Sequence, residues 1–208
     1  MARKQFVVAG TGLSEIIRLC EDFCSDNPDY EFIGFVDDNT DNRKRELYGY
    51  PLLGDFTYVA KRQVLVVNSI ARTTEVRKLS TERLKSLQAT FMNLVHPSTT
   101  LDANSIGTGN VVDRGCIIHR GARIGSHNMF LTNVVVGHDS IIGDNNFIGH
   151  HCVFNGFVTL GSDSYIGGAS IFSPGTTVGS GCNIGMGCNI STNVASGSRL
   201  ISRPPLTL

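Results

Sequence analysis

The sequence predicts two parts of different architecture, an α/β Rossmann-like domain with a parallel sheet and then an all-β parallel β-helix. Strand-like and helix-like runs alternate up to about residue 95. From Ile106 to Ile190 an aliphatic residue or Phe recurs at every sixth position. Charge changes at the same point, because each sign occurs 13 times up to residue 100 and only 5 times afterwards. We therefore expect domains at 1–95 and 96–208.

The first 95 residues contain the elements of consecutive β-α-β units. Buried strands are expected at 6–8, 32–36 and 64–67, with a short closing strand at 91–95. Amphipathic helices are expected at 13–24 and 74–87. Strands and helices of these lengths in alternation are typical of a parallel sheet covered by helices.

The six-residue period of the second part continues through 15 repeats without a slip. A helix needs a period near 3.6 and a simple strand a period of 2, so the pattern is typical of neither. Gly occupies the second place in 9 of the 15 repeats, and small residues or Asn occupy the fifth. We expect first-place and fifth-place side chains to fill a narrow prism, and Gly or Asn to turn its corners. Three hexads make a coil of 18 residues, so residues 106–195 give 5 coils.

Composition excludes several classes of partner. Basic and acidic residues balance at 18 each, which disfavours nucleic acid and membrane surfaces. The first residues, MARKQFVVAG, are not a signal peptide, and no apolar segment is long enough to span a membrane. We therefore expect a cytoplasmic protein. Four cysteines occupy the fifth place of hexads and are expected to be reduced thiols inside the prism: Cys116, Cys152, Cys182 and Cys188.

The histidines of the second part predict no metal site within one subunit. They fall in five different columns of an 18-residue coil: His119, His127, His138, His150 and His151. A trimer interface could still combine them. We expect no metal, and we interpret His150 and His151 as surface or interface residues.

One histidine is followed by an acidic residue that could change its basicity. His138 and Asp139 end the segment Thr132-Asn133-Val134-Val135-Val136-Gly137-His138-Asp139. The third place of a hexad lies at or near a corner, where a side chain can face outward. An acidic neighbour can orient an imidazole and raise its basicity, so His138 is a candidate general base. A solvated corner is the alternative interpretation.

A candidate phosphate-binding turn joins the first expected strand to the first expected helix: Gly10-Thr11-Gly12-Leu13-Ser14. Backbone N–H groups and the helix dipole can bind a pyrophosphate there, although Glu15 replaces the third glycine of the full motif. Asn68 and Ser69 follow the third expected strand at the same edge of the sheet, within reach of a nucleotide or sugar. A nicotinamide dehydrogenase is disfavoured because this part is too short for six strands.

Both halves together resemble one family of sugar O- and N-acyltransferases. The residues that carry the resemblance are the glycine turn, Val36-Asp37-Asp38, the junction Leu94-Val95-His96-Pro97-Ser98, the hexads and the segment 132–139. The family is typified by sialic acid O-acetyltransferase and by the N-acetyltransferases of bacillosamine and perosamine biosynthesis. The resemblance covers nearly the whole chain, and it implies a left-handed β-helix, acetyl-CoA as co-substrate and a homotrimer.

The resemblance also implies roles for individual residues. His138 would take the proton as the sugar nitrogen attacks the thioester, and Asp139 would hold the imidazole. Asp37 and Asp38 would contact the base and ribose of the nucleotide. Acetyl-CoA would lie between neighbouring β-helices against Phe147, Gly156, Gly168 and Met186. A backbone N–H would stabilise the oxyanion, for which Gly156 is a candidate.

The function expected is N-acetylation of a nucleotide-linked amino-deoxy sugar, of the 4-amino-4,6-dideoxy type, for surface polysaccharide such as O-antigen. Three alternatives stay open: O-acetylation of a sugar such as sialic acid, a non-catalytic trimeric nucleotide-binding scaffold, and a zinc γ-carbonic anhydrase. The last is opposed by the histidine columns and by the N-terminal domain. The sequence does not choose among UDP, dTDP and GDP.

Overall fold

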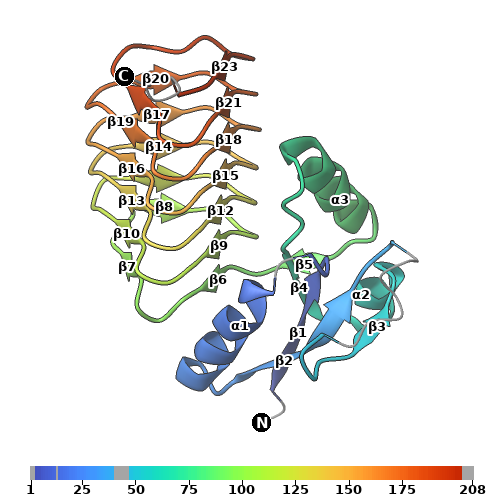
Figure 1. The fold of residues 1–208 in the computed structure, drawn as a ribbon. Helices are drawn as coiled ribbons and strands as arrows, with labels where there is room; N and C mark the ends of the chain where they lie inside the picture. The colour runs from blue at the N-terminus through green and yellow to red at the C-terminus, as the bar shows by residue number, and fades with distance from the viewer. Residues whose placement is uncertain (1–2, 13, 40–46, 203–208) are drawn as a thin grey trace, which may run out of the picture.

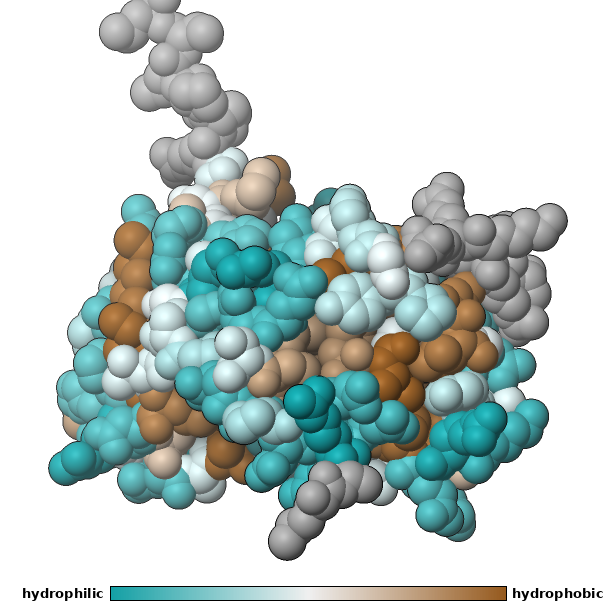
Figure 2. Space-filling view, turned by 90° about the horizontal axis from the view of Figure 1, so that it is seen from below, coloured by the Kyte–Doolittle hydropathy of each residue, from teal (hydrophilic) through white to brown (hydrophobic). Residues whose placement is uncertain are grey.

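The computed structural model describes residues 3–12, 14–39 and 47–202. A small α/β region stands beside a tall triangular β-helix, and the first strand β1 and the last strand β23 lie at opposite ends of the molecule (Figure 1). Viewed from below, the surface is mostly hydrophilic, with separate hydrophobic patches over both parts (Figure 2). None of the helices in these described ranges has the length and apolar character that a membrane crossing requires.

The α/β region contains one parallel sheet with the strand order β3-β2-β1-β4-β5. Its strands are β1 (Lys4–Ala9), β2 (Tyr30–Val36), β3 (Leu52–Gly54), β4 (Leu65–Asn68) and β5 (Thr90–Phe91). Its helices are α1 (Glu15–Asp26), α2 (Thr57–Arg62) and α3 (Thr74–Ser86). The strand order reverses between β1 and β4. In open parallel sheets, the carboxyl ends of the strands at such a reversal border a crevice.

The expected α/β start with a parallel sheet is confirmed, with two differences in its elements. The sequence does not predict β3 or α2, which are too short to show a period. The single closing strand expected at 91–95 is wrong, because β5 and β6 (Leu94–Val95) belong to different sheets. Asn93 turns the chain between them. Its Nδ2 donates to the carbonyl of Gly107 (2.8 Å), and its Oδ1 accepts from the N–H of Asn110 (2.9 Å).

Three parallel sheets form the faces of the β-helix. Face I contains β6, β9 (Val111–Val112), β12 (Met129–Phe130), β15 (Phe147–Ile148), β18 (Tyr165–Ile166), β21 (Asn183–Ile184) and β23 (Arg199–Leu200). Face II contains β7 (Thr100–Leu101), β10 (Ile117–Ile118), β13 (Val135–Val136), β16 (Val153–Phe154), β19 (Ile171–Phe172) and β22 (Asn189–Ile190). Face III contains β8 (Ser105–Ile106), β11 (Arg123–Ile124), β14 (Ile141–Ile142), β17 (Thr159–Leu160) and β20 (Thr177–Val178).

The six-residue period is confirmed by these strands. Every first-place residue predicted from Ile106 to Ile190 ends one of them. The register pairs Val136 with Phe154 and Phe154 with Phe172, so residues one coil apart stack in columns. Parallel sheets and hexapeptide repeats together fit the left-handed form of β-helix. The four cysteines predicted inside the prism are buried and free.

Gly and Asn turn corners as expected, but from the fourth place of the hexads, and the glycines at the second place have another function. The corners are turned by fourth-place residues, which have a positive φ at every sixth position from Gly109 to Gly187. The second-place glycines are needed for close approach instead. A Cβ on Gly137 would lie 2.6 Å from the backbone nitrogen of Gly156 in the next coil. The second place therefore excludes side chains because neighbouring backbones almost touch there.

Helix α1 packs on face I and fixes the α/β region to the prism. Ile16 and Leu19 share an apolar cluster with Val111 and Met129, which face outward from the prism. Burying side chains of this size contributes about 1.5–3 kcal/mol each.

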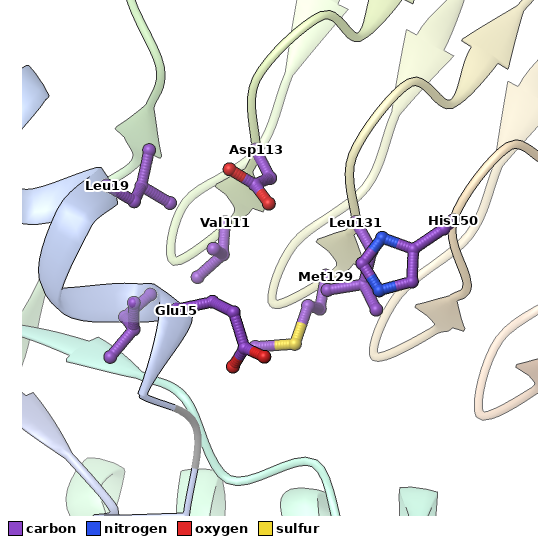
Figure 3. A pocket seen from close by; sticks show the side chains of 8 residues that line it. Glu15, Leu19, Val111, Asp113, Met129, Leu131 and His150 are labelled. Atoms are coloured by element: carbon purple, nitrogen blue, oxygen red, sulfur yellow. The ribbon is translucent and has the colours of Figure 1, made fainter.

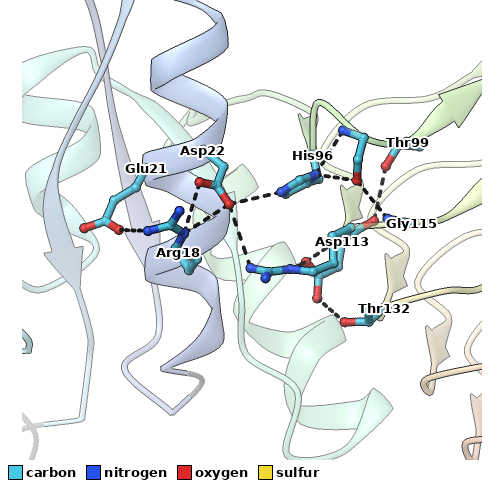
Figure 4. A network of polar contacts seen from close by, with 10 residues as sticks. Arg18, Glu21, Asp22, His96, Thr99, Asp113, Gly115 and Thr132 are labelled. Carbon is cyan, nitrogen blue, oxygen red and sulfur yellow. Dashed lines mark hydrogen bonds and ion pairs between the residues drawn. The ribbon is translucent and has the colours of Figure 1, made fainter.

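A polar network borders this apolar contact and centres on Asp22 (Figure 4). His96 accepts at Nδ1 from the N–H of Ser98 (3.0 Å), so its Nε2 donates to Asp22 (3.1 Å). Arg18 lies 3.0 Å from the same carboxylate. Burial opposes the charge of Asp22, but the His96 hydrogen bond and Arg18 outweigh it and lower the pKa of Asp22. The predicted junction histidine is thus a structural link between α1 and the β-helix.

Helix α3 is tied to the prism by a fully buried arginine. The Nε of Arg77 donates to the carbonyl of His127 (3.0 Å) at the corner between faces III and I. Its Nη1 donates to the carbonyls of Asn68 (2.8 Å) and Ile70 (3.1 Å). Burial lowers the pKa of Arg77 to about 10, so the guanidinium stays charged at neutral pH. One cation therefore joins the carboxyl end of β4, the loop that follows it and the β-helix.

We predict that acid weakens this junction through His127. Its side chain is buried, and burial, with Lys85 and Arg77 nearby, lowers its pKa to about 4. A histidine in the unfolded chain has a pKa of about 6.5. As pH falls, His127 is therefore protonated in the unfolded state before it is protonated in the folded state. The contribution of His127 to the free energy of unfolding should therefore shrink by about 1–3 kcal/mol between about pH 7 and pH 4.5.

Denaturant unfolding of the wild type and of His127→Asn measures this contribution. Asn does not titrate, and it tolerates the positive φ of 59° at this position. The stability difference between the two proteins should narrow as pH falls. A difference that is constant over this range would contradict the prediction.

Candidate functional site

His138 lies at the corner between faces II and III, two residues after the end of β13. Its side chain is 60% exposed, and its Nδ1 lies 3.0 Å from Oδ2 of Asp139. A carboxylate only accepts hydrogen bonds, so the Nδ1 of a neutral His138 carries the hydrogen and its Nε2 keeps a lone pair. The pair expected from the sequence is therefore formed, with the basic nitrogen available to a ligand.

Glycines on the adjoining coils leave room for both side chains. Asp139 has a φ of 58°, and a Cβ on Gly121 in the preceding coil would collide with its carboxylate. In the following coil, a Cβ on Gly156 would lie 2.5 Å from Nε2 of His138. The column expected to place Gly156 beside His138 is therefore present, and Nε2 of His138 adjoins the Gly156 backbone.

A second side chain contacts His138, and the apolar period of the sequence does not reveal it. The ring of Phe157 lies edge-to-face against the imidazole, with 4.8 Å between centroids and an interplanar angle of 85°. The sequence does mark this residue in one way, through the fourth place of the hexads. From position 109 to 187 that place holds Gly, Asn, Asp, His or Ala in every hexad except one, which holds Phe157.

A cavity of about 540 Å³ lies at the carboxyl ends of the α/β strands, where they meet face I. Its lining contains five of the residues expected to bind ligands: Gly10, Gly12, Asp37, Ser69 and Phe147. The structure adds Thr11, Asn39, Ile70, Ala71, Arg72 and Val76. Exposed Arg72 brings a cation to this cavity, which suits an anionic ligand.

Hydrogen bonds within the cavity wall order its loops. The Asp37 carboxylate accepts from Thr11 Oγ1 (2.8 Å) and from the N–H of Asn39 (2.8 Å). The Ser69 hydroxyl donates toward the carbonyl of Ala9 (3.1 Å). Gly10 has a φ of 97°, and a Cβ there would lie 2.5 Å from Cγ1 of Ile70. The tight turn after β1 therefore requires glycine at this position.

The structure does not bring the remaining predicted substrate residues into this cavity. Asp38 accepts from the N–H of Phe56 (2.9 Å) and lies 3.7 Å from Arg83, so it joins α2 and α3. Ser14 lines a separate shallow cleft beside α1. Leu13 lies outside the described residues.

Asn68 is also placed differently from the expectation. Its side chain is fully buried, and its Nδ2 donates to the hydroxyls of Ser80 (2.8 Å) and Thr81 (2.9 Å) on α3. Its Oδ1 accepts from the N–H of Ile70 (3.0 Å). The Asn68 side chain therefore attaches α3 and orders the loop behind the cavity. It does not face a ligand.

The four residues expected to bind acetyl-CoA occupy three places on one chain. Phe147 is on face I, where its ring stacks on Tyr165 at 5.0 Å. Gly156 adjoins His138 at the corner between faces II and III. Gly168 and Met186 follow β18 and β21, at the corner between faces I and II. A single chain therefore does not gather them into one site.

A smaller cavity of about 70 Å³ lies between α1 and face I (Figure 3). It is mostly apolar, with Glu15, Asp113 and His150 among its lining residues. His150 and His151 are exposed, as expected from their places in the coil. Across the described ranges, no group of three or more His, Cys, Asp or Glu side chains is arranged to hold a metal ion.

The large cavity and His138 lie on opposite sides of the same prism. The cavity borders face I, whereas His138 projects from the corner between faces II and III, which is opposite face I in a triangular section. Figure 1 shows the α/β region on one side of the β-helix and β13 on the other.

Comparison with known proteins gives the same fold along almost the whole chain. A family model, the bacterial transferase hexapeptide (six repeats), matches residues 121–156. The acetyltransferase domain of PglB from Neisseria gonorrhoeae, solved with acetyl coenzyme A, is 24% identical with a TM-score of 0.82; the alignment covers 95% of this chain and 96% of that one. A comparison with curated proteins gives no match.

Two further solved structures are similar over the same length. A variant of perosamine N-acetyltransferase from Caulobacter crescentus, in complex with CoA and GDP-perosamine, is 19% identical with a TM-score of 0.83, covering 95% of this chain and 93% of that one. WeeI from Acinetobacter baumannii is 20% identical with a TM-score of 0.76, covering 96% and 97%. At these identities the likeness establishes the fold that the chain shares with these proteins.

We predict that Gly156→Ala disables His138 without unfolding the protein. The backbone at 156 is not in the left-handed region, and the three atoms nearest to the added methyl all belong to the exposed imidazole of His138. The change in stability should stay within about 0.5 kcal/mol, while displacement of the base should lower turnover by about 10²-fold. In a His138→Ala background, the same substitution should add little further loss. Equal losses in both backgrounds would show that Gly156 acts independently of His138.

Proposed function

We propose that this chain is an acetyl-CoA-dependent N-acetyltransferase acting on a nucleotide-linked amino-deoxy sugar, of the 4-amino-4,6-dideoxy type. The observation that carries the proposal is the exposed His138, oriented by Asp139, with Nε2 beside the Gly156 backbone. The structural neighbours with bound acetyl coenzyme A, or with CoA and GDP-perosamine, support it. Synthesis of surface polysaccharide is the pathway class that such a product would enter.

In the proposed reaction, the neutral sugar amine attacks the thioester carbonyl carbon of acetyl-CoA. A C–N bond forms as the amine proton passes to Nε2 of His138, and the C–S bond breaks when the tetrahedral intermediate collapses. The imidazolium then returns the proton to the thiolate of CoA. Asp139 stabilises the imidazolium, and general-base catalysis of this kind contributes about 10²–10⁴-fold. The Gly156 N–H is our candidate for the oxyanion donor.

We place the nucleotide in the cavity of the α/β region, which we interpret as a Rossmann-like domain. The strand order and the glycine turn at the start of α1 support this assignment. Gly10, Gly12 and Ser69 would line the phosphates and sugar, and exposed Arg72 would balance their charge. We keep residues 1–95 as the nucleotide-sugar-binding domain and 96–208 as the acetyltransferase domain.

We propose a homotrimer whose site forms between copies. His138 and the nucleotide cavity of one chain lie on opposite sides of the prism, so the base must come from a neighbour. Acetyl-CoA would then lie between Gly156 of one copy and Gly168 and Met186 of the next. The outward side chains of Ile117 and Ile171, which leave face II partly apolar, support packing between copies. The free cysteines favour the cytoplasm as the compartment.

The first test is an assay of CoA release with acetyl-CoA and a panel of UDP-, dTDP- and GDP-linked 4-amino-4,6-dideoxy sugars. We expect turnover of one sugar, and a fall of about 10² or more in His138→Ala. No turnover of any amino sugar would contradict N-acetylation. Turnover of a hydroxyl acceptor such as sialic acid would instead establish an O-acetyltransferase.

A second prediction concerns the shared site. Gly12→Glu places a carboxylate in the phosphate-binding turn, and a Cβ at this position meets no atom within 4 Å, so the fold should be kept. Gly12→Glu and His138→Ala should each be inactive alone. When the two chains are co-expressed and assort randomly, about a quarter of the sites combine an intact turn with an intact base, and activity should recover to about that level. Without recovery in verified mixed trimers, the site would belong to a single chain.

A further inference from the structure

Phe157 occupies a corner position that is unfavourable for a bulky apolar residue. Its φ of 64° is in the left-handed region, where β-branched or bulky side chains are uncommon. It is also 59% exposed, so it gains little from burial within the chain. Local strain of this kind persists where the surroundings impose it, often at functional sites.

The direction of the Phe157 side chain follows from its neighbours in the prism. Side chains at positive-φ corners lean back over the preceding coil. Asp139 lies over Gly121, and Asn133 lies over Gly115, since a Cβ on either glycine would collide with the side chain above it. Phe157 follows the same rule, and the corner that it covers is that of His138 and Asp139.

Three contacts thus surround the His138 imidazole. Asp139 holds Nδ1 at 3.0 Å, and the Gly156 backbone adjoins Nε2. The Phe157 ring stands almost perpendicular to the imidazole at 4.8 Å. A single hydrogen bond at Nδ1 leaves an exposed side chain free to swing about it. A second contact on the ring removes that freedom.

We propose that Phe157 is a positioning residue for the general base, which holds the imidazole so that Nε2 stays over Gly156. The proposal rests on the proposed function of His138. The backbone of Phe157 contributes to the same geometry, because its N–H donates to the carbonyl of His138 at 2.9 Å. The coil therefore fixes the backbone of the histidine, and the Phe157 side chain fixes its ring.

Phe157→Gly separates this role from a structural one. Gly121 and Gly175 occupy the same column with positive φ, so glycine suits the backbone here. We expect a melting temperature and a trimer content no lower than those of the wild type. We expect kcat to fall about tenfold or more, with KM for acetyl-CoA changed by less than about threefold, because the base is no longer held in place. Phe157→Tyr should restore most of the lost activity.

Two results would overturn the proposal. One is a Phe157→Gly variant that is stable, trimeric and as active as the wild type. The other is a variant whose activity falls only in proportion to its trimer content, which would make Phe157 an interface residue. A His138→Ala, Phe157→Gly double variant should be no less active than His138→Ala alone, because both changes act through one side chain.

A readout independent of turnover tests the ring contact. The imidazole C–H resonances of His138, assigned by their loss in His138→Ala, should shift in Phe157→Gly because the neighbouring aromatic ring is removed. They should shift much less in Phe157→Tyr. If the wild type acetylates no amino sugar, the proposed function fails while this measurement still reports on the contact. Unshifted His138 resonances in Phe157→Gly would overturn the positioning role by themselves.

Discussion

The ladder of backbone hydrogen bonds between successive coils is the constraint on which the rest of the molecule depends. Val135 donates to the carbonyl of Cys152 (2.9 Å) and Gly137 to that of Phe154 (2.6 Å), and bonds of this kind continue along the prism. Buried N–H and C=O groups must be paired, so the coils cannot slip against each other without losing many bonds together. The ladder therefore fixes which residue lies above which. Gly156 adjoins His138 because the two are one coil apart.

Because the coils are fixed in register, the corners and faces of the prism carry different groups. The corner between faces II and III carries His138, whereas the corner between faces III and I receives α3 through the carbonyl of His127. Face I is occupied by α1. These assignments leave the proposed nucleotide site and the proposed base on opposite sides of one chain. Association of copies follows as a geometric need of the proposed reaction, since a rigid prism cannot fold back to close the distance.

The sequence predicts the features that depend on this ladder. The six-residue period predicts the strands, the columns, the buried cysteines and the neighbourhood of His138 and Gly156, because all follow from counting along a regular coil. Asn68 could not be predicted, because its partners Ser80 and Thr81 reach it only when α3 docks. The role of Phe157 depends on a positive φ at the fourth place, which the apolar period does not reveal. The parallel α/β start is also predictable, but its short elements β3 and α2 carry no period.

Local contacts position the proposed general base, whereas contacts between distant parts of the chain shape the proposed nucleotide site. The groups around the base lie at sequence separations of one residue or about one coil, so a single regular element can position them. The residues around the cavity come from three strand ends, a loop held by Arg77 and a face of the β-helix. Their arrangement depends on how α1 and α3 dock, and their meeting with His138 depends on a second copy. Changes in docking can therefore alter which nucleotide sugar the proposed site binds while the geometry around His138 is preserved, because the backbone bonds beside His138 lie at the corner between faces II and III, away from α1 and α3.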